Sequence, residues 1–111
     1  MTLRTVGRGD FGKSSQDGFT GGKKTVTTNG TAEQLPSNAV PSGFLVVVKA
    51  LASNSTPVHI AKTKALAEVD ATAYQLNAGE TIGLKVKNTD AIWVDANTNG
   101  EGVTFIFEES S

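Results

Sequence analysis

The segment from Asp95 to Gly100 carries oxygen-bearing side chains at the spacing that a calcium loop uses. Asp95, Asn97 and Asn99 match the first, third and fifth positions of such a loop, and Gly100 matches the sixth. The twelfth position should be a glutamate that binds calcium through both oxygens, but it is Ile106. Asparagine and glycine also tolerate positive φ in tight turns. The segment is therefore predicted to be a turn rather than a tight calcium site.

Side chains suited to acid–base or nucleophilic catalysis are sparse. There is no cysteine, and the single histidine, His59, lies between Val58 and Ile60 and points to the opposite side of that strand. His59 is predicted to be a surface or cross-strand residue. The carboxylates fall on predicted turns and strand ends, where solvation accounts for them: Asp70, Glu80, Asp90, Asp95, Glu101, Glu108 and Glu109. We therefore expect neither an enzyme nor a bound cofactor or metal.

Trp93 and Tyr74 are candidates for a different kind of site. Aromatic rings exposed on a β-sheet can stack on sugar rings, and clustering of such rings on one surface would favour carbohydrate binding. Carbohydrate binding is therefore an alternative function of the chain.

Period-two alternation predicts the strands that position these residues. The run from Thr81 to Lys87 alternates, and strands are also predicted for residues 91–95 and 103–108. The most hydrophobic run, residues 44–51, is rich in valine and is predicted to be a central strand. Alternation assigns nine side chains to the core: Phe44, Val46, Val48, Ile82, Leu84, Val86, Val103, Phe105 and Phe107.

Turn signals organise the remainder of the chain. Asn29-Gly30 predicts a hairpin between residues 23–28 and 31–35. Residues 61–73 could form one helical turn but are predicted to be strand plus loop. The spacing of the strands indicates an all-β fold with negligible helix, a sandwich or barrel of roughly seven or eight strands. Residues 23–111 are predicted to form this single domain, as an antiparallel β-sandwich.

Residues 1–22 differ in composition and are predicted to form an extended arm. They contain six of the twelve glycines, and Val6, Phe11 and Phe19 are their main hydrophobic residues. Two interpretations are open. The segment is either a tail without a binding role or an arm ordered by a partner, with Phe11 and Phe19 as anchors.

Charge is distributed unevenly along the chain. The first 30 residues hold two aspartates against five basic side chains, namely Arg4, Arg8, Lys13, Lys23 and Lys24, while the remainder holds five lysines against nine carboxylates. A basic segment can lie on the acidic body of a neighbouring copy or on another acidic protein. Without an arginine cluster or interleaved aromatic residues, nucleic-acid binding is not expected. No apolar run suggests a membrane span or a secretory signal, and the lack of cysteine suggests folding in a reducing cytoplasm, so we expect synthesis there without membrane contact.

Three stretches carry a family resemblance. They are L-x-A-G-E-x-I-x-L-x-V-x-N-x-x-x-I-W-V at residues 76–94, G-V-T-F-I-F-E at 102–108, and P-S-G-F-L-V-V-V-K-A at 41–50 with Asn54, Pro57 and Val58-His59-Ile60 after it. Together they resemble small virion proteins of tailed bacteriophages. The resemblance covers about residues 35–108 and leaves out the arm.

The resemblance implies a jelly-roll-like sandwich. It also implies a capsid decoration (cement) protein, which sits as a homotrimer on the capsid exterior of the virion and clamps the major capsid protein. The basic charge and the spaced aromatic residues of the N-terminal segment, rather than the resemblance, give the expected assembly contacts: Arg4, Arg8, Phe11, Lys13, Phe19, Lys23 and Lys24. The alternative is a receptor- or glycan-binding module of a phage tail or fibre.

Overall fold

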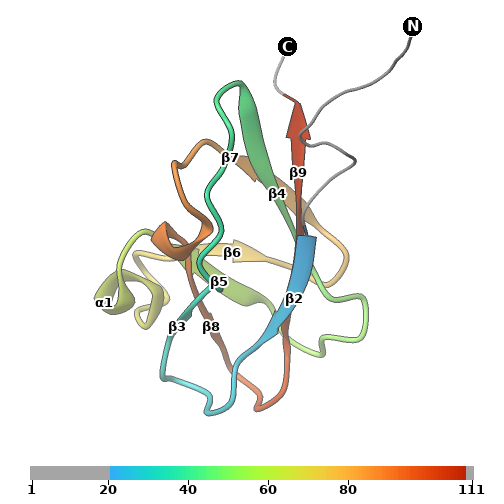
Figure 1. Ribbon diagram of the computed structural model, residues 1–111. Coiled ribbons are helices and arrows are strands. Elements are labelled where there is room, and N and C mark those ends of the chain that lie inside the picture. The colour runs from blue at the N-terminus through green and yellow to red at the C-terminus, as the bar shows by residue number, and fades with distance from the viewer. Residues whose placement is uncertain (1–20, 110–111) are drawn as a thin grey trace, which may run out of the picture.

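A computed structural model describes residues 21–109 and arranges them as two four-stranded antiparallel sheets (Figure 1). The first sheet contains, in spatial order, β2 (Gly21–Thr25), β9 (Gly102–Glu109), β4 (Phe44–Ala50) and β7 (Thr81–Leu84). The second contains β3 (Glu33–Gln34), β8 (Trp93–Ala96), β5 (Val58–Ala61) and β6 (Tyr74–Leu76). Two short helices, α1 (Lys64–Ala67) and the 3₁₀ turn η1 (Thr89–Ala91), complete the described part. No helix within residues 21–109 has the length and apolarity to cross a membrane.

The strands pair as one long hairpin that is rolled up. β5 pairs with β6 at the closed end, and then β4 pairs with β7, β3 with β8 and β2 with β9. Successive pairs fall alternately in the two sheets, and β4–β9 and β5–β8 contacts join the pairs laterally. This is the strand order of a jelly roll. The predicted all-β, jelly-roll-like sandwich is confirmed.

The core lies between the two sheets, where the alternation placed it. Val46, Val48, Val103, Phe105 and Phe107 are buried. The other four predicted core residues, Phe44, Ile82, Leu84 and Val86, are partly buried and pack against that core. The second sheet contributes buried Val58, Ile60, Leu76, Val94 and Ala96. Full burial of a side chain of this size contributes about 1.5–3 kcal/mol, so these two facing layers supply most of the stability.

The predicted hairpin around Asn29-Gly30 is wrong. β2 pairs with β9 in the first sheet, whereas β3 pairs with β8 in the second. The chain does turn at Gly30, whose φ is +82°. However, the Val26 N–H donates to Glu101 O at 2.8 Å, which keeps the chain beside β9 until it crosses to the other sheet. Pairing with β9 and β8 therefore overrides the local turn signal.

The prediction of strand plus loop for residues 61–73 misses helix α1. Thr63 caps this single turn, because its hydroxyl accepts from the Leu66 N–H at 3.2 Å. Glu68 accepts from the Lys64 ammonium at 2.6 Å and from the Ala32 N–H at 2.8 Å, which ties the helix to the chain just before β3. α1 contacts β5 and β8. It therefore covers the side of the second sheet that faces away from the core.

Glycines allow β2 to lie close against β9. A Cβ atom on Gly102 would lie 2.7 Å from the Thr25 Cα and would also collide with the Lys24 carbonyl oxygen. At the other end of the pair, a Cβ atom on Gly21 would lie 2.6 Å from the Phe105 carbonyl oxygen. β2 begins at Gly21, two residues before the predicted domain boundary.

Candidate interaction surface

Only two of the seven predicted assembly contacts lie within the residues that the structure describes. Arg4, Arg8, Phe11, Lys13 and Phe19 lie outside residues 21–109. Lys23 and Lys24 lie on β2, at the edge of the first sheet. Lys23 is exposed and lies opposite Thr104, on the side away from the core. Lys24 lies opposite the buried Val103 and reaches across to the other sheet.

Lys24 closes one edge of the sandwich. Its ammonium lies 2.6 Å from Glu33 Oε1 on β3, so the ion pair bridges the two sheets. The second oxygen, Glu33 Oε2, accepts from the Thr27 N–H at 2.8 Å. The hydrogen bond from Lys24, followed by that from Thr27, holds the pKa of the Glu33 carboxyl below its ordinary value of 4.5. Lys24 therefore has a structural partner, while Lys23 is available on the surface.

The opposite edge of the sandwich is open. An apolar groove of about 330 Å³ lies between β7 of the first sheet and β5 and β6 of the second. We call it the β7 groove. Its apolar lining includes Ile60, Ile82, Leu84, Val86, Ile92 and the ring of Tyr74, and Lys62 is the charged residue in it. The Tyr74 side chain is 56% exposed. No ion pair among the described residues closes this edge, so apolar surface remains accessible to a partner.

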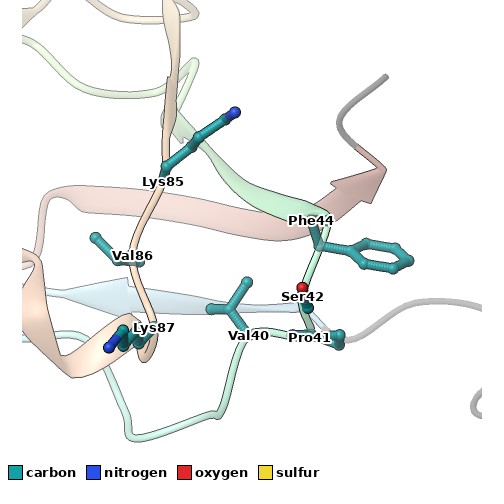
Figure 2. Close-up of a pocket in the computed structure, with 8 residues that line it drawn as sticks. Val40, Pro41, Ser42, Phe44, Lys85, Val86 and Lys87 are labelled. Carbon is teal, nitrogen blue, oxygen red and sulfur yellow. The ribbon is translucent and has the colours of Figure 1, made fainter.

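A second hollow of about 410 Å³ lies next to the β7 groove (Figure 2). It forms where the pairing beside β4 changes register. Ala39 lies opposite Asn88, and Val46 lies opposite Leu84. The chain therefore advances seven residues from Ala39 to Val46 but only four from Leu84 to Asn88. The extra residues form a turn at Pro41–Gly43, and Gly43 has a φ of +85°. In Figure 2, Val40 lies between the two separated segments, and the Phe44 ring points away from residues 85–87.

The outer face of the first sheet has an apolar centre surrounded by lysines. Leu45, Val47 and Ile106 point away from the core, and Ile106 is 44% exposed. Exposed Lys23, Lys49 and Lys85 surround them, and Glu108 lies opposite Leu45. Within residues 21–109, none of these three lysines forms an ion pair. We call the surface formed by Leu45, Val47, Ile106, Lys23, Lys49 and Lys85 the basic face.

His59 is the cross-strand residue that was one of its two predicted positions, but it is buried, and Asp95 is buried against the prediction of a solvated carboxylate. Both residues are 2% exposed and face each other across β5 and β8, beneath α1. His59 Nε2 lies 3.5 Å from Asp70 Oδ1, and its buried Nδ1 has no hydrogen-bond partner within the described part of the chain. Asp95 Oδ1 accepts from the Gly30 and Ala96 N–H groups, at 3.0 and 2.8 Å. A substrate would have to displace α1 to reach these side chains.

The turn predicted for Asp95–Gly100 forms at residues 97–100, while Asp95 and Ala96 end strand β8. Gly100 has a φ of +87°, and its N–H donates to Val26 O at 2.7 Å. Asn99 Oδ1 accepts from both the backbone N–H and the side-chain amide of Asn29, at 2.7 and 2.8 Å. Two of the three oxygens proposed as calcium ligands, on Asp95 and Asn99, therefore bind the neighbouring Asn29-Gly30 turn.

Trp93 and Tyr74 lie on opposite sides of the second sheet. Tyr74 lies opposite Ile60, which faces the core. Trp93 lies opposite Ala61, the next residue along β5, which faces the other way. The two rings therefore cannot form a shared stacking platform.

The sequence carried part of the signal for these surfaces. Alternation already places Lys49 on the same side of β4 as Leu45 and Val47, which indicates an apolar outer face with a basic edge. The β7 groove depends on how far apart β7 of the first sheet and β6 of the second lie, and no local sequence pattern predicts that separation.

The comparisons with known proteins add no relative, because no protein-family model, no curated protein and no solved structure matches the chain.

Proposed function

We propose that this chain is a bacteriophage virion structural protein, a trimeric capsid decoration protein that binds the outside of the major capsid lattice. The observation that carries the proposal is the basic face. An apolar patch bordered by lysines without ion-pair partners among the described residues suits a protein surface that is itself acidic and partly apolar. The jelly-roll topology supports the same function, since viral capsid proteins use it, although lectin domains use it too.

Attachment of this kind works by repetition of modest contacts. The basic face offers three apolar side chains and three lysines per copy, which is a small contact. A trimer presents three such faces at once, so dissociation requires simultaneous loss of all contacts. Residues 1–20, with Arg4, Arg8 and Lys13, would add a second point of attachment per copy. The capsid is thereby stabilised without any chemical step.

The alternative, a glycan-binding module of a tail or fibre, has weaker support. It needs aromatic rings gathered on one surface, but Trp93 and Tyr74 lie on opposite sides of the second sheet. The buried His59–Asp95 pair likewise lies out of reach of a sugar. The exposed groups favour a protein partner.

The basic face can be tested on particles of a phage that encodes this chain, prepared without the encoding gene. Purified protein is added back, and copies per particle are measured by quantitative gel analysis and electron microscopy. Ile106→Asp puts a carboxylate in the centre of the basic face and should lower occupancy at least about tenfold. Val69→Asp is the matched control, because Val69 is 49% exposed but lies just after α1, away from this face. Equal occupancy for both variants would exclude the basic face from attachment.

The segment before β2 is tested in the same assay. Deletion of residues 1–20 should reduce occupancy while leaving β2 intact, because β2 begins at Gly21. Neutralising Arg4, Arg8, Lys13 and Lys23 together should weaken binding and reduce its salt dependence. Lys24 is left unchanged because of its ion pair with Glu33. Wild-type protein found on tails or fibres, or absent from particles, would refute the decoration function itself.

A further inference from the structure

We propose that the β7 groove binds Phe11 from residues 1–20 of a neighbouring copy. This inference rests on the proposed function, because a trimeric decoration protein has other copies of the chain beside it.

The β7 groove has the size and chemistry for a large apolar side chain. Its volume of about 330 Å³ is at the low end for small-molecule sites, and its lining is aliphatic apart from Tyr74 and Lys62. Aromatic rings prefer edge-to-face or offset contacts, and the half-exposed Tyr74 ring at the rim offers one. The other edge of the sandwich is already closed by Lys24 and Glu33, so the β7 groove is the edge that lacks a cover within residues 21–109.

The sequence of residues 1–20 supplies a matching occupant. Phe11 follows Asp10 directly, so one short stretch offers an aromatic ring for the apolar lining and a carboxylate for Lys62. Phe19 lies only two residues before Gly21 on β2. Two extended residues span about 7 Å, which is less than the roughly 14 Å across the three strand spacings from β2 to β7, so Phe19 falls short of the β7 groove of its own copy. Phe19 also has no carboxylate directly beside it, because Gly18 and Thr20 flank it, so Phe11 is the better match for a groove that contains Lys62.

A neighbouring copy can deliver Phe11 more directly than the same copy can. From Gly21, the shortest route of a chain to its own β7 groove crosses the outer face of the first sheet, from β2 to β7. That route passes Lys49 and Lys85, and the segment is net positive, with Arg4, Arg8 and Lys13 against Asp10 and Asp17. Like charges along the route oppose it. A segment from a neighbouring copy need not cross the basic face to reach the open β7 edge.

Cysteine cross-linking of the full-length chain tests the inference without any particle, because the chain has no cysteine of its own. Asp10→Cys and Lys62→Cys proteins are purified separately, mixed and oxidised, and the disulfide is mapped by peptide mass spectrometry. We expect a covalent dimer joined between positions 10 and 62. Lys49→Cys replaces Lys62→Cys as the matched control, since Lys49 is also an exposed lysine but lies on the basic face. The control pair should give at most about a tenth of that yield.

Removing the ring tests the role of Phe11 itself. Phe11→Ser in the Asp10→Cys protein should lower the dimer yield about tenfold, whereas Phe19→Ser should leave it unchanged. Equal yields from Lys62→Cys and Lys49→Cys, or no effect of Phe11→Ser, would overturn the inference. So would a double Asp10→Cys, Lys62→Cys protein that closes only within one chain. Because occupancy on particles is measured separately, such a result leaves the decoration function standing.

Discussion

His59 and Asp95 face each other across β5 and β8, and both are buried although neither belongs to the apolar core. The pair lies on the outer side of the second sheet, where helix α1 and the Asn29-Gly30 turn cover it. Buried polar groups are costly unless they are hydrogen-bonded, so the positions of α1 and of the turn matter for stability. In the described chain, Asp95 has backbone donors, while His59 has Asp70 at one nitrogen.

Asp95→Ala should destabilise the fold by about 1–3 kcal/mol, because Gly30 and Ala96 lose the carboxylate that accepts from their N–H groups. Chemical denaturation monitored by Trp93 fluorescence measures the loss. Asp95→Asn keeps one oxygen acceptor and should cost less. Calcium should leave the wild-type unfolding midpoint unchanged, because Asp95 and Asn99 already bind the Asn29-Gly30 turn. A calcium-dependent midpoint that Asp95→Ala abolishes would contradict this assignment.

Phe105→Ala should cost about 3–5 kcal/mol, because Phe105 is 3% exposed and its removal leaves a cavity between the sheets. Ile106→Ala is the adjacent control. Ile106 points to the basic face and is 44% exposed, so its truncation should cost less than about 1 kcal/mol. Urea titration of both variants measures the difference. A larger loss for Ile106→Ala would mean that the faces of β9 are assigned the wrong way round.

The Lys24–Glu33 pair should make stability depend on pH in the acid range. The folded pKa of Glu33 lies below its ordinary value of 4.5, so the pair stabilises the fold fully above that pH. Its contribution is lost as the pH falls through the folded pKa. The two side chains are 25% and 26% exposed, which limits the pair to about 1 kcal/mol or less. Wild type and Glu33→Gln should therefore differ near neutral pH and converge in acid. A constant difference across the titration would rule out the ion pair as its cause.

Gly102→Ala should cost about 1–3 kcal/mol, because the new methyl group collides with the backbone of β2 at Lys24 and Thr25. Gly83→Ala is the matched control in the same sheet. Its methyl group would meet the mobile end of the Leu45 side chain at 3.3 Å and should have little effect. Hydrogen exchange would show whether the damage is local, since β2 amides should lose protection first. Uniform loss of protection throughout the sheet would argue against selective release of β2.

Alternation predicted the core because side chains in a strand must point to opposite faces. Phe105 and Phe107 indeed lie opposite Val48 and Val46, on the inner face of the first sheet. The same rule correctly placed His59 on the side away from the core, but it did not predict that His59 is buried there. It identifies the side away from the core, but it cannot report that another element, here α1, covers that side. The sequence held a signal for α1 in the Thr63 cap and in the Lys64–Glu68 spacing.

Pairing partners were the part that local patterns could not predict. Asn29-Gly30 turns the chain as expected, but β2 and β3 then pair with strands about 80 and 60 residues further along the chain, respectively. The β7 groove was missed for the same reason. Its walls come from β5, β6 and β7, and their separation depends on the packing of the two sheets.

The rolled-up hairpin also implies an order in which the strands can come together. β5 and β6 are joined by residues 62–73, whereas β2 meets β9 only after the whole of residues 26–101 has been brought into place. Closing a longer loop costs more chain entropy, and folds dominated by distant contacts form slowly, over milliseconds to seconds. We therefore expect β2 to be added last. Residues 1–20 precede β2 directly, so the point from which this segment extends is fixed on the sandwich only when β2 is added.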